Sequence, residues 1–557
     1  MNQINVRVWL AVSLVLFYSS KSVNAENSKT VPPLPAQVTI APGVFSPNWK
    51  SLEAGYECPQ WFRDAKFGIW AHWSAQCQPE MGDWYARNMY MEGSDDYKYQ
   101  VAHYGHPSQV GFKDIDNLWK ADHWDPDAMM KLYKAAGAKY FMALANHHDN
   151  FDCYDSTYQP WNSVNIGPKK DIVGTWAKIA RKYGLRFGVS NHSSHTWHWF
   201  QVAYGYDTEG PFKNVLYDGW LTRADGTGKW WEGYDPQDLY AGPRYAPPKG
   251  LDAAQMKAWY EKHDQWYESI PPDDHGYSEK WFLRCQDLMD KYHPDLLYFD
   301  DTSLPLEQYG LDIAAHFYNA NTAWHDGSLE AVITAKQLPE DQRKALVEDY
   351  ERGASGEIQP LPWQTDTCIG SWHYDRSIFE QHRYKTVETV VKMLVNIVSK
   401  NGNLMLNIPV RGDGTIDSDE IAFLHGLADW MNVNGEGIFA TRPWKIYGEG
   451  PAAGSSGMFN EGKVQYTDQD IRFTQSKQGD TLYAFFLGWP KEPKLTIHAL
   501  GSGTTARAAL LDKQIASISL LGSSENISWS QNADGLHVAL PANPPCKEAY
   551  ALKLSLK

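Results

Sequence analysis

Ionisable side chains stand at the ends of three short apolar runs in this sequence. One run, rich in strand-forming residues, ends in the carboxylate Asp300, and Asp301 follows it. The other two end in imidazoles, at His72 and at the adjacent pair His147 and His148. A carboxylate there can serve as a nucleophile or a general acid/base, and imidazoles can bind hydroxyl groups or a metal. If the strands are parallel, their carboxyl ends converge on one face, where the active sites of α/β barrels lie.

The elements that would position these side chains alternate between strand and helix from about residue 61 to residue 430. Asp125 and Asp171 each precede an amphipathic stretch and are expected to cap helices. A further helix, 281–292, leads into the strand that ends at Asp300. Helix followed by strand, repeated along the chain, is typical of βαβ units. The pattern predicts an α/β fold with a (β/α)8-like catalytic barrel.

The composition changes after about residue 434, where Gly-rich segments precede short strand-like runs separated by turn residues. This pattern predicts a small C-terminal β-sandwich. We place the catalytic domain at residues 26–445 and the sandwich at residues 446–557. A stretch at about 204–277 is rich in Gly, Pro and aromatic residues and has little periodicity. It predicts a long insertion over the barrel mouth.

The first 25 residues have the pattern of a secretory leader. Arg7 precedes an apolar run, and small residues end at Ala25, after which cleavage is expected. We therefore expect an exported protein, either periplasmic or extracellular. No later apolar run approaches the roughly 18 residues that a membrane helix needs, so no membrane span is expected.

The composition also bounds the partners. The formal net charge is −16, and it becomes −18 once the leader leaves with Arg7 and Lys21, so nucleic acid is not an expected partner. Aromatic residues make up 14% of the chain, enough for a packed core and for stacking against sugars. The six cysteines have no C-x-x-C spacing, so a zinc site is not predicted, and disulfide pairing stays open.

Several motifs, in order along the chain, resemble the retaining α-L-fucosidases of glycoside hydrolase family 29. They comprise the segments 61–73, 146–149, 183–189, 294–300 and 401–408. The resemblance implies an exo-acting enzyme that removes terminal α-L-fucosyl residues from a fucosylated oligosaccharide or glycoconjugate through a covalent glycosyl-enzyme intermediate. It implies no cofactor and no metal.

The resemblance also assigns the two catalytic roles. Asp300 closes the strand motif where the family has its nucleophile, and Glu351 lies where several members have the acid/base. The acid stands on a variable loop in this family, so Glu357 and Glu348 remain alternatives. The nucleophile must stay ionised while the acid stays protonated, which requires two different environments.

A set of sugar-binding side chains is implied in the same way. They match, or stand beside, family positions that contact the sugar: His72, Asp83, Trp84, His147, His148, His192, Tyr298 and Trp363. Three depart from the common residue, since Asp83 replaces a Glu, His192 a Tyr and Tyr298 a Trp. These changes make L-galactose an alternative to L-fucose, because a hydrophobic pocket rejects an added hydroxyl only weakly.

Three alternative functions stay open. The first is an α-L-galactosidase on the same machinery. The second is a catalytically weak carbohydrate-binding relative, because Trp363 is followed by Gln364 where many relatives have a Trp–Glu pair, and Gln cannot donate a proton as an acid. The third is a metal-dependent hydrolase that uses His147 and His148. The linkage cleaved, the aglycone and the oligomeric state are left open by the sequence.

Overall fold

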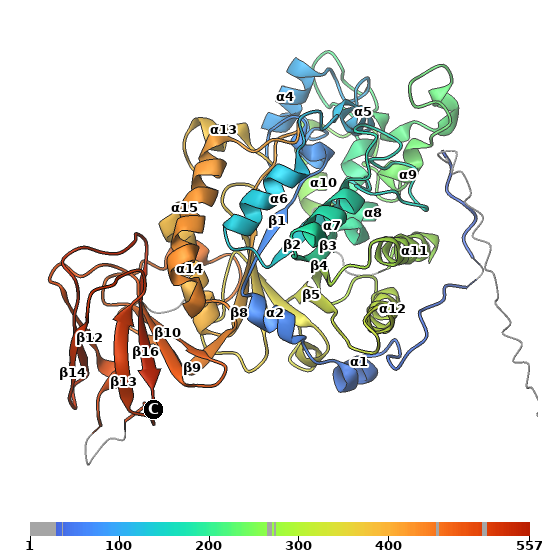
Figure 1. Ribbon diagram of the computed structural model, residues 1–557. Helices are drawn as coiled ribbons and strands as arrows, with labels where there is room; N and C mark the ends of the chain where they lie inside the picture. The colour runs from blue at the N-terminus through green and yellow to red at the C-terminus, as the bar shows by residue number, and fades with distance from the viewer. Residues whose placement is uncertain (1–28, 36, 264–269, 272–274, 453–455, 504–508) are drawn as a thin grey trace, which may run out of the picture.

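The structure is a computed structural model that describes residues 29–35, 37–263, 270–271, 275–452, 456–503 and 509–557. Its centre is a closed barrel of eight parallel strands that follow one another in chain order (Figure 1). The strands are β1 (Phe67–Ala71), β2 (Tyr140–Asn146), β3 (Arg186–Asn191), β4 (Leu296–Thr302), β5 (Val332–Lys336), β6 (Val347–Glu351), β7 (Trp363–Cys368) and β8 (Gly402–Asn407). The predicted barrel is confirmed.

Helices cover the outside of most of this barrel (Figure 1). They are α6 (Pro126–Ala135), α7 (Ile172–Lys182), α11 (His275–Tyr292), α12 (Gln308–Trp324), α14 (Val387–Ser399) and α15 (Ser418–Asn434). Helix α2 (Gln60–Ala65) instead closes the amino end of the barrel, where Phe62 packs against the inward-facing Tyr140. Two connections depart from the alternation. Between β5 and β6 there is one 3-10 turn, η6 (Gln342–Lys344), and β6 joins β7 through a loop. The repeat is therefore (β/α)8-like rather than complete.

A single aspartate caps the first turn of each of two helices, as predicted. The Asp125 carboxylate accepts a hydrogen bond from the backbone N–H of Ala128 at 3.0 Å, at the start of α6. The Asp171 carboxylate accepts one from Gly174 at 2.9 Å, at the start of α7. Each cap satisfies a backbone donor that the first turn of a helix leaves unpaired.

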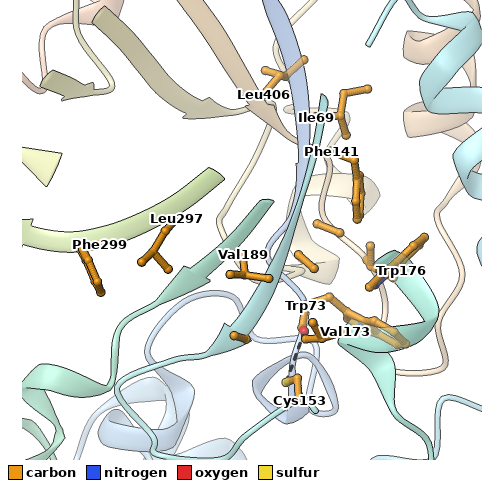
Figure 2. Close-up of a cluster of buried hydrophobic side chains, with 14 of the residues drawn as sticks. Ile69, Trp73, Phe141, Cys153, Val173, Trp176, Val189, Leu297, Phe299 and Leu406 are labelled. Atoms are coloured by element: carbon orange, nitrogen blue, oxygen red, sulfur yellow. Dashed lines mark hydrogen bonds between the residues drawn. The ribbon is translucent and has the colours of Figure 1, made fainter. Parts of the chain in front are cut away.

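Side chains alternate between the two faces of the barrel wall. Outward-facing residues such as Phe141, Val189 and Leu297 belong to the core between the barrel and its helices (Figure 2). In this core Phe141 packs against Trp176 of α7. Inward-facing residues fill the barrel: Trp70, Tyr140, Met142, Leu296, Tyr298, Val332, Val347 and Met405. Because the period of a strand is two, this alternation decides which polar residues can reach the barrel mouth.

Short helices gather at the carboxyl ends of β1 and β3. They are α3 (Tyr85–Asn88), α4 (Asp95–His103) and α5 (Phe112–Leu118) after β1, and α8 (Thr196–Trp199), α9 (Pro236–Tyr240) and α10 (Ala253–His263) after β3. The two groups are bonded to each other, since the hydroxyls of Tyr90 and Tyr240 lie 3.0 Å apart and both donate to Asp218. The predicted insertion therefore packs at the mouth end of the barrel. Two smaller helices, α1 (Trp49–Gly55) and α13 (Arg376–Glu380), complete this part of the chain.

Two antiparallel sheets follow the barrel, as the sequence predicts for a sandwich. The larger has the order β13 (Ile515–Leu520), β16 (Tyr550–Leu556), β11 (Thr481–Phe486), β10 (Ile471–Ser476), β9 (Thr441–Glu449); the smaller has the order β12 (Lys494–Ile497), β15 (Leu536–Ala539), β14 (Ser528–Gln531). The boundary that we drew at residue 445 falls inside β9. The sheets lie beside α14 and α15 (Figure 1), and Arg472 of β10 donates to Asn396 of α14 at 2.9 Å.

None of the helices in the described parts of the chain combines the length and the apolar character that a membrane crossing requires.

Candidate active site

A cavity of ≈ 480 Å³ opens at the carboxyl ends of the barrel strands. Of the ten residues selected from the sequence, eight line it: His72, Asp83, Trp84, His147, His192, Tyr298, Asp300 and Glu351. They converge because the carboxyl ends of parallel strands in a closed barrel meet on one face. The volume is in the range of small-molecule pockets, about 300–1,000 Å³.

Lys336, the last residue of β5, connects the two carboxylates to which we assigned catalysis. Its ammonium group forms ion pairs with Asp300 on β4 and with Glu351, the last residue of β6. Because β4, β5 and β6 are neighbours in the barrel, side chains at their carboxyl ends can meet around one nitrogen. Sequence reasoning missed Lys336, although a lysine that closes a run of strand-forming residues is the same kind of signal that identified Asp300.

A bulge in β4 sets the directions of the adjacent carboxylates. The pairing register with β5 shifts between Tyr298 and Thr302, and such bulges often re-aim a side chain next to an active site. Asp300 thereby faces Lys336, whereas Asp301 accepts a hydrogen bond from the Ser194 hydroxyl at 3.0 Å. The two neighbouring carboxylates therefore have different partners and different roles.

Opposite protonation preferences separate Asp300 from Glu351. Burial alone would raise the pKa of Asp300, but Lys336 and His148 outweigh it and hold that pKa well below its usual range. Burial raises the pKa of Glu351 to about 7; Lys336 opposes this shift, and the charges of Asp366 and Asp300 add to it. At pH 6 the first group is ionised and the second is mostly protonated, which is the division that a nucleophile and an acid require.

The adjacent histidines reach different parts of the site. Strand β2 ends at Asn146, so the alternation that would send neighbours to opposite faces no longer applies. His147 lines the cavity. His148 donates from Nδ1 to the backbone oxygen of His192 at 2.8 Å, which turns its Nε2 toward Asp300, 3.3 Å from Oδ2. His148 therefore contacts the carboxylate that we assign as the nucleophile.

Four polar side chains form a compact group on one side of the cavity. They are His72, Asp83, His147 and His373, whose nearest ligand-type atoms all lie within 4.8 Å of one another. Asp83 accepts from Nδ1 of His373 at 2.7 Å, and Nδ1 of His147 lies 2.8 Å from the Gln76 amide nitrogen. The grouping differs from the metal set considered from the sequence, because His148 is turned toward Asp300 instead.

Burial keeps the cavity imidazoles neutral. It lowers the pKa of His72, His147 and His192 well below the usual value, and neighbouring histidines add to the lowering at each of them. A neutral imidazole has one N–H donor and one bare nitrogen acceptor. Such groups can both donate to and accept from hydroxyl groups without bringing charge into the pocket.

Aromatic rings form another part of the cavity wall. The ring of Trp70 lies 4.9 Å from that of Tyr298, 5.4 Å from Trp372 and 6.0 Å from His192, measured between centroids. All four residues line the cavity. Flat apolar faces of this kind suit the C–H face of a sugar ring.

Trp363 is the predicted sugar-binding residue that the structure places away from the cavity. It is buried on the outer face of β7, where its indole nitrogen donates to the backbone oxygen of Lys400 at 2.8 Å and its ring lies 5.2 Å from that of Tyr350. The alternation of β7 directs the next residue, Gln364, into the barrel. Trp363 contributes to the core beneath the helices, and we leave it out of the proposed site.

Gln364 belongs to a buried hydrogen-bond chain below the cavity. Its amide nitrogen donates to Asp349 at 2.8 Å, and its amide oxygen accepts from the Tyr140 hydroxyl at 2.9 Å. Because it does not line the cavity, its lack of an acidic group is no argument against catalysis. Burial raises the pKa of Asp349, and the adjacent Asp366 raises it further.

We expect Gln364→Glu to destabilise the protein by roughly 2–4 kcal/mol at pH 8, because a donor to Asp349 is replaced by a third buried carboxyl group. The free energy of unfolding depends on pH in this variant, because burial raises the folded-state pKa of the introduced carboxyl group. Its protonated form is tolerated at low pH, and stability is lost as the pH rises above the unfolded value of about 4.3. Urea unfolding at pH 5 and pH 8 measures this, with the exposed Gln381→Glu as control. Equal losses at both pH values would contradict the prediction.

The two alternative acids lie elsewhere. Glu348 accepts from Arg343 at 2.9 Å and from the Tyr350 hydroxyl at 3.1 Å, and Glu357 is exposed on the loop after β6. Neither lines the cavity, whereas Glu351 does. Geometry therefore favours Glu351 among the three.

Several cavity residues were missed from the sequence. Trp372 lies in a segment, 371–374, whose aromatic and imidazole content was a usable signal. His373 of the same segment is buried and donates to Asp83. Met458 and Phe459 had no such signal, because they lie beyond the boundary that we drew for the catalytic domain.

Comparison with known proteins places this site in a family. Residues 34–436 match the family described as Alpha-L-fucosidase, and residues 465–555 match the Alpha-L-fucosidase C-terminal domain. The tissue alpha-L-fucosidase of Macaca fascicularis is 25% identical, and the alignment covers 98% of this chain and 96% of that protein. The tissue alpha-L-fucosidase of Mus musculus is 26% identical, and the alignment covers 93% of this chain and 96% of that protein. The fold resembles the crystal structure of Thermotoga maritima alpha-fucosidase in complex with a mechanism based inhibitor, with TM-score 0.67, 24% identity and coverage of 92% of this chain and 100% of that one. The chain belongs to the alpha-L-fucosidase family and is a glycoside hydrolase.

Proposed function

We propose that this chain is an exo-acting, retaining α-L-fucosidase that removes terminal α-L-fucosyl residues from glycans. The observation that carries the proposal is the pair Asp300 and Glu351, which face each other across the single ammonium group of Lys336 at the mouth of the barrel. Retaining glycosidases hold their carboxyl groups about 5–5.5 Å apart, whereas inverting enzymes need about 6.5–9.5 Å to admit a water. Two carboxylates that contact one nitrogen lie close together, which supports the retaining mechanism.

In the first step, an Asp300 oxygen attacks the anomeric carbon and forms the glycosyl ester. The bond to the leaving oxygen breaks, and Glu351 transfers its proton to that oxygen. In the second step, Glu351 takes a proton from water, the water oxygen attacks the same carbon, and the ester bond to Asp300 breaks. Glu351 ends protonated and Asp300 ionised, as at the start, and two inversions give net retention.

The remaining cavity residues would bind the sugar. His72 and His147 are neutral and can exchange hydrogen bonds with ring hydroxyls, and Asp83 can accept from one. Trp70 and Tyr298 offer flat faces to the apolar side of the ring. The carboxylate of Asp83 is one methylene shorter than a glutamate, and its bond to His373 fixes where it can reach.

The test is hydrolysis of an aryl α-L-fucoside with the first-formed product anomer followed by NMR. We expect the α anomer before mutarotation, and a β anomer would overturn the retaining mechanism.

The same assay with an aryl α-L-galactoside addresses the second candidate, which the unusual residues His192 and Tyr298 favour. Faster hydrolysis of the galactoside would assign that activity instead.

We expect the pH dependence of kcat/KM to have its alkaline limb near pH 7, because activity is lost as Glu351, whose pKa is about 7, gives up its proton. The acid limb lies below the usual Asp range, because the pKa of Asp300 is lowered and the group stays ionised there. Lys336→Met removes the charge that lowers both values. Both limbs should then move to higher pH, together with a loss of rate.

The measurement is a pH profile of each variant, with Arg343→Met as control. Arg343 contacts Glu348 outside the cavity and should leave both limbs in place. An alkaline limb that does not move in Lys336→Met would contradict the assignment of that limb to Glu351.

We also propose export, on the basis of the apolar leader pattern in residues 1–25. These residues lie outside the part of the chain that the structure describes.

A further inference from the structure

We propose that Phe459, with Met458, forms the binding site for the leaving-group sugar, and that this subsite takes a pyranose ring presenting its apolar C–H face. The inference rests on the proposed function, since it assigns a second subsite to the same reaction. Both residues lie on the segment between β9 and β10, two neighbouring strands at one edge of the larger C-terminal sheet. Neither the family match for residues 34–436 nor that for residues 465–555 includes them.

The first argument is position. A general acid protonates the oxygen between the two sugars, so the leaving group must lie on the side of the cavity where Glu351 stands. The backbone N–H of Phe459 donates to the backbone oxygen of Glu351 at 2.9 Å, and both side chains line the cavity. The Phe459 ring thus stands next to the acid.

The second argument is that this segment is fixed to the strand that carries the acid. Gly457 and Ala354 exchange two backbone hydrogen bonds, at 3.0 and 3.2 Å, and the N–H groups of residues 460 and 461 both donate to the oxygen of Arg352. The approach is so close that a Cβ on Gly353 would lie 2.0 Å from the oxygen of Gly457. A segment held this way can present a side chain at a defined place.

The third argument concerns Phe459 itself. The residue is 62% exposed although it lines the cavity, so it stands at the rim. Its φ is +54°, in the left-handed region that bulky residues rarely adopt. Such strain persists only where the surroundings impose it, and it is typical of ligand contacts. Stacking on a ligand would explain why an aromatic residue beside the acid is both exposed and held in a strained backbone conformation.

The neighbouring rim residues have the same character. Trp372 lines the cavity, and the guanidinium of Arg352 lies 5.3 Å from the centre of its ring. The Arg352 side chain is also engaged with Cys368 at 2.8 Å. Trp372, Met458 and Phe459 thus give the cavity flat and apolar surface, which suits the C–H face of a sugar ring.

The experiment compares two substrates with the same fucosyl group. One is α-L-fucosyl fluoride, whose leaving group has no ring. The other is a fucosyl disaccharide of galactose or N-acetylglucosamine. Its linkage is the one that the wild type cleaves fastest among (1→2), (1→3), (1→4) and (1→6). The readout is the ratio of kcat/KM for the disaccharide to that for the fluoride, which cancels any general effect on folding or on the fucose pocket.

We expect Phe459→Ala and Phe459→Leu to lower this ratio about 5- to 10-fold, whereas Phe459→Tyr, which keeps the flat ring, holds it within about 2-fold. Trp529→Ala, at a partly exposed tryptophan on β14 of the sandwich, is the matched control and should not change the ratio. A ratio unchanged in Phe459→Ala, or a wild type that cleaves the fluoride and none of the disaccharides, would overturn the subsite. A wild type that cleaves neither kind of substrate would instead overturn the proposed function.

Discussion

Asp300→Ala is expected to fold and to lose at least about 10³-fold in turnover, because covalent catalysis depends on the attacking carboxylate. The fold should persist because Lys336 keeps its ion pair with Glu351 after the substitution. Removal of the carboxylate also leaves space beside the anomeric carbon. Added azide should enter from the face that Asp300 occupied, attack an activated fucoside and restore turnover with formation of β-fucosyl azide.

The neighbouring carboxylate provides a matched control. Asp301 is bonded to Ser194, so Asp301→Asn tests the loss of a carboxylate on the same strand without loss of the attacking group. We expect a smaller loss of turnover in that variant and no rescue by azide. If Asp300→Ala retained more than about a tenth of the wild-type rate, or if azide produced only the α product, Asp300 would not be the nucleophile.

Glu351→Ala is expected to separate substrates by their leaving groups. Hydrolysis of a disaccharide should fall by about 10²- to 10⁴-fold, because a sugar oxygen needs its proton before it departs. Formation of the intermediate from fucosyl fluoride should be nearly spared, since fluoride leaves without that proton. Azide should then attack the intermediate in place of water and give α-fucosyl azide, and the alkaline limb of the pH profile should disappear with the group whose pKa is about 7.

Two other glutamates serve as controls for this assignment. Glu348→Gln and Glu357→Gln alter carboxylates outside the cavity and should leave the alkaline limb in place. If one of them removed the limb while Glu351→Ala kept it, the acid would have to be reassigned to that residue.

Local rules in the sequence determined the framework. The caps at Asp125 and Asp171, the alternation of helix and strand, and the polar ends of the apolar runs are decided by residues near one another in the chain. The same rules located Asp300 and the histidines, because a polar side chain directly after a buried strand has few places to go in a parallel barrel.

The facing of individual side chains was decided by tertiary structure. A shift of one residue along a strand moves a side chain to the other face. Trp363 therefore faces the helices and Gln364 faces the barrel interior, and the composition of the strand does not reveal which is which. The bulge in β4 similarly depends on its pairing with β5, and it separates Asp300 from Asp301.

Contacts between distant segments were also beyond the sequence. Lys336 was identifiable as a strand end, but its position between two carboxylates depends on the neighbouring order of β4, β5 and β6 in the closed barrel. Phe459 lies about a hundred residues from Glu351 in the chain, and a backbone hydrogen bond between them holds them together in the fold. Chain-local patterns thus determined which residues could do chemistry. Two features of the tertiary structure decided which of these residues meet: the closure of the barrel, and the packing of the segment after β9 against the end of β6. Both depend on pairing between segments that are far apart in the chain, which local sequence patterns do not reveal.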